Sequence, residues 1–388
     1  MRRFLRLLPA ALIAVISLNS CNSTVHSAVP QFTAVYEQTV DNSEPDANSG
    51  SEDDSEPDNT LVLSSYSSDP DKLYERLREA LHGYNSTIDF SGKIQQDMVF
   101  TAIHRLMEED PDIFWLDGCT VSTDAKHTQI EIHVFNNYSA EQIREMHTAL
   151  VAAADDIIAQ VPQDASDYDK ILFVHDYLVH TTEYDTAGAD ADKRGIWGTS
   201  YGCLVRGKAV CQGYAEAFKY IMNRLGIECG VTTGETDGER HAWNYVMADG
   251  EYYWIDVTWD DPISDDDTTD NLRYTYFLIN DDMLARSRTI IPKDDRFVPV
   301  CTSLDNNYFV HNGCYLSEYS IAAIADIMAQ HTDEREVSIL CADEEVYAET
   351  ISRLIEDAEI WKAAARVELG EQVFFAQDDE ALIISIKF

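Results

Sequence analysis

The chain has 388 residues, enough for two or three domains, and its 45% hydrophobic and 25% charged residues are typical of a globular protein. This composition excludes wholesale disorder and a collagen-like repeat. The 28 Lys and Arg are far outnumbered by 70 Asp and Glu, giving a formal charge of -42. A field of this sign repels phosphate backbones, so no nucleic-acid partner is expected.

Residues 1–20 are predicted to be a signal peptide. Three arginines within the first six residues give a basic start, and the apolar run from Leu7 to Leu18 is too short to span a bilayer. The segment that ends at Cys21 then resembles a bacterial lipobox, whose cysteine receives the lipid. We therefore expect an exported protein that is anchored in the cell membrane only through lipid on Cys21 and faces the extracytoplasmic side. The alternative is an ordinary secretory signal cleaved nearby.

Residues 21–68 are predicted to be a disordered acidic tether. No Lys or Arg occurs between Cys21 and Lys72, and residues 41–60 hold eight Asp and Glu with almost nothing apolar. Such a composition cannot bury enough apolar surface to offset the entropy of ordering. The tether is expected to hold a folded domain away from the lipid.

Residues 69–165 are predicted to form a helical lead-in with a small hairpin. Apolar residues recur at helical spacing over 73–81 and 98–107, whereas residues 128–134 alternate as in a strand. A capping box at Ser139 opens another predicted helix, which stops before a proline.

The most informative stretch lies in the predicted core, residues 166–290, which opens with a second capping box at Ser166. After Cys211, apolar residues step at helical spacing until Gly226 supplies a stop, so Cys211 is predicted in the first turn of a helix. Unpaired N–H groups at a helix start favour a thiolate and can serve as oxyanion donors. A buried cysteine on a helix is normally inert, so Cys211 alone would not indicate catalysis.

A hairpin is predicted after this helix. Residues 240–248 and 251–259 are aromatic and β-branched runs joined by Asp249-Gly250, a dipeptide that suits a two-residue I′ turn.

The register of this hairpin places two polar residues on one face. If residue 248 faces residue 251, Trp243 lies opposite Asp256 and His241 lies opposite Thr258. His241 and Asp256 are then diagonal neighbours, about 7–8 Å apart at Cα, within reach of a side-chain hydrogen bond.

A thiol, an imidazole and a carboxylate in this arrangement form a catalytic set. Cys211 is the predicted nucleophile, His241 its base, and Asp256 the group that orients the imidazole. Each residue has a structural explanation when taken alone, and the combination favours catalysis.

The motifs Val210–Ala215, His241–Asn244 and Asp256–Asp260 resemble those of the bacterial transglutaminase-like superfamily, and the resemblance covers residues 166–280. It implies an α+β, papain-like core, with the cysteine on a helix packed against an antiparallel sheet that bears the histidine and the aspartate. It also implies thioester chemistry on an amide. Candidates for further roles are Tyr201 as an oxyanion donor and, for a substrate pocket, Trp243, Trp254 and Trp259.

Residues 291–388 are predicted to be an accessory α/β region without a catalytic constellation. Short strands are expected from residue 297, with helices over 319–331 and 344–364 and strands over 371–376 and 381–387.

The remaining cysteines leave their pairing open. Six could form three disulfides outside the cell, with fifteen connectivities: Cys119, Cys203, Cys229, Cys301, Cys314 and Cys341. Their spacing does not suggest a structural zinc site. The acidic segment of Asp260, Asp261 and Asp265–Asp267 lacks the glycine and closing glutamate of an EF-hand and is interpreted as a solvated loop. No metal or cofactor is expected.

The sequence therefore predicts an exported cysteine enzyme that acts on an amide bond of a peptide, protein or cell-wall peptide. Water as acceptor gives a protease or amidase, and an amine gives a transglutaminase. The alternative is a non-catalytic peptide- or wall-binding module on the same fold.

Overall fold

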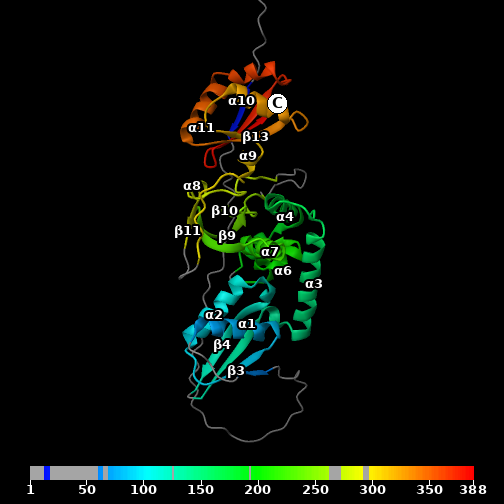
Figure 1. The fold of residues 1–388 in the computed structure, drawn as a ribbon, viewed down its shortest axis with the longest axis vertical. Helices are drawn as coiled ribbons and strands as arrows, with labels where there is room; N and C mark the ends of the chain where they lie inside the picture. The colour runs from blue at the N-terminus through cyan, green and yellow to red at the C-terminus, as the bar shows by residue number, and fades with distance from the viewer. Residues whose placement is uncertain are drawn as a thin grey trace, which may run out of the picture. The chain divides into compact units, whose positions relative to one another are not determined.

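The computed structural model of the protein describes residues 13–17, 60–63, 69–124, 126–191, 194–261, 272–291 and 297–388. Most of the predicted signal peptide and tether lies outside these ranges. The chain forms two compact units, and the α+β class is confirmed (Figure 1). Unit 1 consists of Met1–Val25, Glu235–Asp237 and Val246–Phe388, and unit 2 of His26–Gly234 and Gly238–Tyr245.

Unit 2 begins with a sheet of order β2-β3-β5-β4, in which β3 and β4 both run antiparallel to β5. The helices α1 and α2 pack beside this sheet (Figure 1). The predicted helices and the alternating strand are confirmed, whereas β2 and β3 were not predicted. The bounds are β2 Thr60–Leu63, α1 Pro70–His82, β3 Thr87–Ser91, α2 Gln96–Glu109, β4 Leu116–Thr123 and β5 His127–Val134.

The longer helices of unit 2 begin where local signals place them. Ser139 and Ser166 form capping boxes at the starts of α3 and α4, as predicted. Gly226, at φ +78°, follows the end of α7. Most residues of α7 are buried, not only the apolar residues at helical spacing that predicted the helix. The bounds are α3 Ala140–Ile158, α4 Asp167–Thr181, β6 Glu183–Tyr184, α5 Thr186–Ala189, α6 Ser200–Leu204, β7 Lys208–Ala209 and α7 Cys211–Arg224.

A sheet of order β10-β9-β8-β11 follows, and its strands β8 and β9 run from one unit into the other. Its two tight turns share one dipeptide. Asp249 and Gly250 have φ of +53° and +85°, which confirms the predicted turn, and Asp237-Gly238 repeats it at +52° and +80°. The second turn carried the same signal and was missed. The bounds are β8 Cys229–Thr236, β9 Glu239–Ala248, β10 Glu251–Ile255 and β11 Arg288–Ile290.

The predicted pairing of His241 with Thr258 is wrong, because β10 ends at Ile255. The chain turns at the next residue, where the carbonyl of Asp256 accepts a hydrogen bond from the amide of Asp260 at 3.3 Å.

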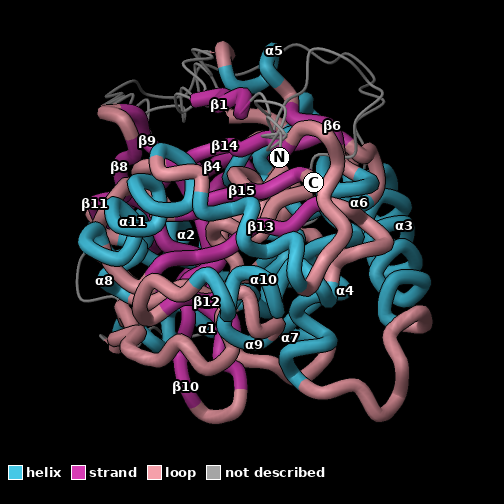
Figure 2. The backbone as a smooth tube through the Cα atoms, turned by 90° about the horizontal axis from the view of Figure 1, so that it is seen from above, coloured by secondary structure: helices cyan, strands magenta, loops and turns pink. Residues whose placement is uncertain are grey.

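The C-terminal part of unit 1 contains a sheet of order β1-β14-β15-β13-β12. Figure 2 shows β13, β14 and β15 side by side, with α10 and α11 among the surrounding helices. β1 comes from the apolar part of the predicted signal peptide, so a chain cut before Cys21 would lack it. The bounds are β1 Ile13–Ser17, α8 Asp281–Leu284, α9 Tyr308–His311, β12 Tyr315–Leu316, α10 Ile321–Gln330, β13 Glu336–Cys341, α11 Glu344–Thr350, β14 Val373–Asp378 and β15 Ile383–Lys387.

Two secondary-structure predictions for this region need correction. The helix predicted over 344–364 breaks, because Ala358 adopts a left-handed conformation at φ +57°. Strand β13 was not predicted, and β12 is the one strand that the structure describes between residues 297 and 335. None of the helices in the described ranges is long and apolar enough to cross a membrane.

Candidate functional site

Cys211 is the first residue of α7, as the sequence predicts. The helix is preceded by Val210, whose side chain forms no cap, whereas serine side chains cap α3 and α4. Cys211 is buried and packs with Ala215 and with Ala242 of β9. A thiol therefore lies at a helix start where no side-chain cap competes for the first amides.

Backbone from an earlier segment approaches this helix start closely. The amide of Val210 donates to the carbonyl of Trp197 at 3.0 Å. A Cβ at Gly213 would lie 2.5 Å from the same carbonyl oxygen, so only glycine fits there. The close approach of the Trp197 backbone was not predicted. Gly213 was the sequence signal for it, because a glycine can mark a place where another backbone segment comes close.

His241 lies on β9, one residue before the alanine that contacts Cys211. It is buried, and its ring stacks on Trp243 with a centroid distance of 5.9 Å. Asn244, also buried, donates from Nδ2 to the carbonyl of Ala215 at 2.9 Å and to that of Gly230 at 3.1 Å. These bonds fix β9 against both α7 and β8. Sequence reasoning missed this role of Asn244.

Asp256 follows β10 and is 2% exposed. Its Oδ2 accepts hydrogen bonds from Nε and Nη2 of Arg288 at 3.1 and 2.5 Å, and its Oδ1 accepts one from the amide of Trp259 at 3.3 Å. Within unit 2, the structure thus places Cys211 in contact with Ala242, the residue that follows His241. Asp256 belongs to unit 1. Sequence reasoning missed Arg288.

The three candidate pocket tryptophans differ in exposure. Trp243 and Trp254 are 1% and 0% exposed, and Trp254 Nε1 donates to the carboxylate of Asp281 at 2.8 Å. Both rings are buried, which stabilises the fold, but only the indole N–H of Trp254 has an internal acceptor, whereas Nε1 of Trp243 is buried without a hydrogen-bond partner. Trp259 is 37% exposed and lies beside the guanidinium of Arg288. Of the three, Trp259 alone is partly exposed, and a contact of any of them with a substrate stays a prediction.

Tyr201, the candidate oxyanion donor, lies on α6. Its ring stacks on that of Phe114 at a centroid distance of 5.1 Å and is buried. Its role at the oxyanion stays a prediction.

A group of buried charged residues supports α7 from the side of the lead-in. Lys219 donates from Nζ to the carbonyls of Glu108 and Glu109 at the end of α2, at 3.2 and 2.7 Å. Burial raises the pKa of Glu216, which accepts a hydrogen bond from Gln212 at 2.8 Å. These contacts join α7 to the lead-in, so the lead-in is part of the scaffold of Cys211.

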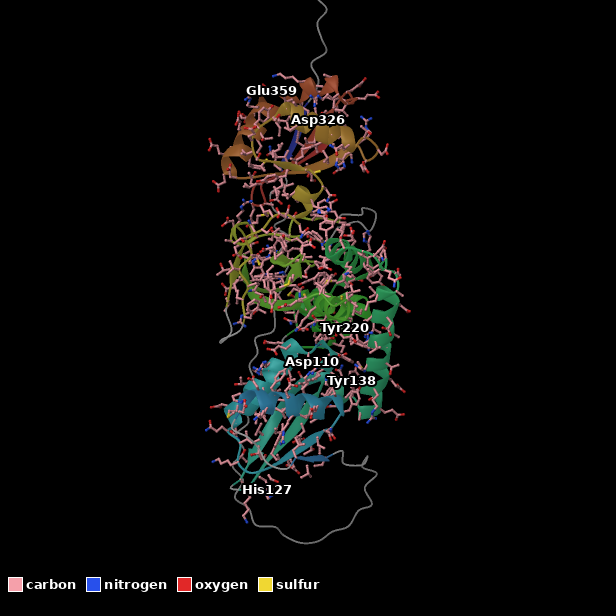
Figure 3. All side chains as sticks on the ribbon, viewed as in Figure 1. Asp110, His127, Tyr138, Tyr220, Asp326 and Glu359 are labelled. Carbon is pink, nitrogen blue, oxygen red and sulfur yellow. The ribbon has the colours of Figure 1, made fainter. Side chains whose placement is uncertain are left out.

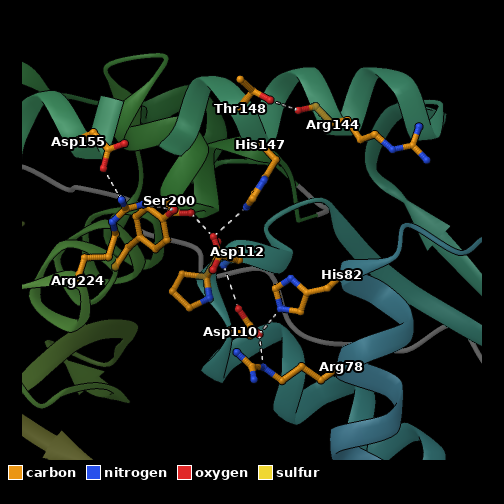
Figure 4. A network of polar contacts seen from close by, with 12 residues as sticks. Arg78, His82, Asp110, Asp112, Arg144, His147, Thr148, Asp155, Ser200 and Arg224 are labelled. Carbon is orange, nitrogen blue, oxygen red and sulfur yellow. Dashed lines mark hydrogen bonds and ion pairs between the residues drawn. The ribbon is translucent and has the colours of Figure 1, made fainter. Parts of the chain in front are cut away.

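A polar network around two aspartates makes a second link, drawn in Figure 4. Asp110 accepts from Arg78 Nε at 2.6 Å and pairs with His82 Nε2 at 2.9 Å. Asp112 pairs with His147 at 3.0 Å and also interacts with Tyr220 of α7, which Figure 3 labels near Asp110.

The contribution of His82 to stability should depend on pH. The hydrogen bond to Asp110 raises the pKa of His82 above its ordinary value. The contribution of this pair is therefore complete below the unfolded-state pKa of about 6.5 and is lost as pH rises through the raised folded-state pKa. Burial alone would raise the pKa of Asp110, but the bonds from His82 and Arg78 lower it. Protonation of the Asp110 carboxylate therefore weakens the network only on acidification below about pH 4.

We expect the difference in Tm between the natural protein and His82→Gln to be largest near pH 5–6 and to shrink towards pH 9. His127→Gln is the control, since the side chain of His127 is exposed on the surface of the same unit. A difference for His82→Gln that stays constant from pH 5 to pH 9 would contradict this interpretation.

None of the other cysteines within the described part of the chain forms a disulfide. Burial raises the pKa of Cys119 and Cys301 to about 12 and that of Cys341 to about 11. Cys314 lies 3.5 Å from His331 Nε2, but burial raises the pKa of its thiol too. A cysteine–histidine contact alone therefore does not make a reactive thiol here.

Asp260 corrects the interpretation of the acidic segment as a solvated loop. It is fully buried, and its carboxylate oxygens accept from the amide of Tyr276 at 3.0 and 3.2 Å. Asp265–Asp267 lie outside the described residues. Within the part of the chain that the structure describes, no three His, Cys, Asp or Glu side chains are grouped to hold a metal ion.

Comparison with known proteins found similarity to one protein family and to several proteins. A family model described as "Transglutaminase-like superfamily" matches residues 152–258. The Kyphoscoliosis peptidase of Homo sapiens is 29% identical over 119 residues, which cover 27% of this chain and 18% of that protein. The Kyphoscoliosis peptidase of Mus musculus is 25% identical over 165 residues, which cover 39% of this chain and 24% of that protein. The chain thus spans less than a quarter of either relative.

A similar solved structure is described as "Crystal structure of a TGase". It is 16% identical to this chain with a TM-score of 0.28, and the match covers 49% of this chain and 55% of that chain.

Proposed function

Because residues 152–258 belong to the transglutaminase-like superfamily, we propose that the protein is a cysteine-dependent acyl-transfer enzyme acting on amide or peptide bonds. The observation that carries the proposal is the position of Cys211. Its thiol lies at a helix start without a side-chain cap and packs against the residue that follows His241. Asp256 completes the proposed set, since it follows β10, the strand paired with β9.

The proposed reaction has two steps. The Cys211 thiolate attacks the amide carbonyl carbon, the C–N bond breaks, and the imidazolium of His241 protonates the leaving amine, which yields a thioester. Water or a second amine then attacks the thioester carbonyl, gives a proton to His241 and releases Cys211. Amides of the first turn of α7 are the proposed donors to the oxyanion in both steps.

The acceptor decides between a protease or amidase and a transglutaminase. Trp259, exposed beside the Asp256–Arg288 pair, is the proposed contact for a peptide or cell-wall peptide substrate. An acidic protein also favours substrates that carry amines, because opposite charges attract.

Mass spectrometry of the intact protein tests the function directly. After brief incubation with a panel of wall peptides and glutamine-containing peptides, we expect an acyl adduct on Cys211 that disappears in Cys211→Ala. Added amines should release the adduct as a cross-linked product if the enzyme is a transglutaminase, and as free acid if it is a hydrolase. A peptide that is retained while Cys211 stays unmodified would favour a non-catalytic binding module.

We also propose that the protein is exported and held at the extracytoplasmic face of the cell membrane by lipid on Cys21, on the grounds of the lipobox-like segment that ends there. Cys21→Ser should move the protein from the membrane fraction to the soluble fraction, because an acyl anchor is the proposed attachment. Urea unfolding of the released protein should match that of the natural one. A natural protein that fractionates as soluble, with an unmodified Cys21, would refute the anchor.

A further inference from the structure

Arg288 is a buried cation that the proposed reaction does not yet use. It begins β11, and its side chain is 0% exposed. Two of its nitrogens donate to Oδ2 of Asp256, and Nη1 donates to Oγ of Ser287 at 2.7 Å. A guanidinium that donates two hydrogen bonds to one carboxylate oxygen fixes both the position and the charge of the carboxylate.

Aromatic rings enclose this ion pair. The guanidinium carbon lies 3.6 Å from the ring centroid of Tyr276 and 5.0 Å from that of Trp259. The backbone amide of Trp259 holds the other oxygen of Asp256 at 3.3 Å. Both carboxylate oxygens therefore have fixed donors within unit 1.

The charges around Arg288 keep it protonated. Burial alone would lower the pKa of Arg288, but Tyr276 and Asp256 raise it above its ordinary value. Burial raises the pKa of Tyr276, and the neighbouring Arg288 opposes that rise. Burial, together with Asp237 and Asp378, raises the pKa of Glu380, the other acid that faces Arg288. Asp256 is the acid that pairs directly with this guanidinium.

We propose that Arg288 is a positioning residue for the reaction, which holds the carboxylate of Asp256 ionised and in one orientation. This inference rests on the proposed function, in which Asp256 orients His241. A buried carboxylate without a cation tends to take up a proton, because charge is costly at low dielectric. A protonated Asp256 would no longer stabilise the imidazolium that keeps Cys211 as a thiolate.

The pH dependence of Cys211 alkylation measures this effect without a known substrate. The rate with iodoacetamide is followed from pH 4 to pH 9 by mass spectrometry of the Cys211 peptide. In Arg288→Met the midpoint of the acid limb should move up by about 1–3 pH units, the range over which an arginine shifts a neighbouring carboxyl. Arg288→Gln, which keeps donors but no charge, should shift the limb in the same direction.

Two controls separate charge from packing. Arg288→Lys retains the positive charge and should keep the midpoint within about one unit of the natural value. Arg286→Met removes a nearby arginine that donates to the carbonyl of Ala381 and does not contact Asp256, and it should leave the profile unchanged. In an Asp256→Asn background, Arg288→Met should cause no further shift, since no carboxylate remains to be protonated.

The outcomes also separate this inference from the proposed function. If Arg288→Met or Arg288→Gln is folded by circular dichroism and labels slowly at all pH values without moving the limb, Arg288 is only structural and the inference fails. The pair Arg288→Gln and Arg288→Lys decides the question if Arg288→Met does not fold. If Cys211 labelling is instead indifferent to His241→Ala in the natural background, the proposed function itself fails.

Discussion

Cys211 should be alkylated by iodoacetamide at pH 6 on the order of ten times faster than any other cysteine of the folded protein, and His241→Ala should remove most of that difference. The thiolate is the reactive form; the start of α7 favours it, and so does the imidazolium of His241 in the proposed function. The thiols of Cys119, Cys301 and Cys341 have raised pKa values and stay protonated at this pH. Peptide mapping after a short exposure to reagent gives each rate.

Cys314 supplies a matched control for this experiment. It also contacts a histidine, at 3.5 Å, but burial raises the pKa of its thiol and it does not begin a helix. Its rate should be low and should not change in His331→Ala. Equal rates for Cys211 and Cys314, with no response to His241→Ala, would identify Cys211 as a packed core residue and support the binding module.

Trp243→Ala should lower the free energy of unfolding by about 3–5 kcal/mol, the usual cost of removing a large buried aromatic side chain. Trp243 is 1% exposed and supports the ring of His241 by stacking. The variant should also lose activity, because the imidazole would no longer be held in one orientation. Urea denaturation measures the first effect, and Cys211 alkylation at a pH where the variant is folded measures the second.

Trp259→Ala is the contrasting variant. Because Trp259 is partly exposed, we expect a smaller loss of stability and an effect mainly on KM for a peptide substrate. Similar losses of stability in both variants would argue against the assignment of Trp243 to the core and of Trp259 to the substrate site.

The sequence alone predicted the features that depend on residues close together in the chain. The capping boxes at Ser139 and Ser166, the start of α7 at Cys211 and the turn at Asp249-Gly250 are all found where their signals occur. Each is governed by hydrogen bonds or dihedral angles within a few residues, so the local pattern is sufficient. The turn at Asp237-Gly238 could have been predicted for the same reason, because it has the same dipeptide as the turn at Asp249-Gly250.

Other features were decided by tertiary contacts. Nothing near Asp256 in the sequence indicates that Arg288, 32 residues later, donates to its carboxylate. Likewise, Trp243, Trp254 and Trp259 occur in similar aromatic surroundings, and only packing determines that the first two are buried while the third reaches solvent. Hydrophobicity predicts that aromatic residues tend to be buried, but it does not predict which part of the chain covers each one. The positions of Cys211 and His241 therefore follow from local signals, whereas the environment of Asp256 follows from the path of the whole chain.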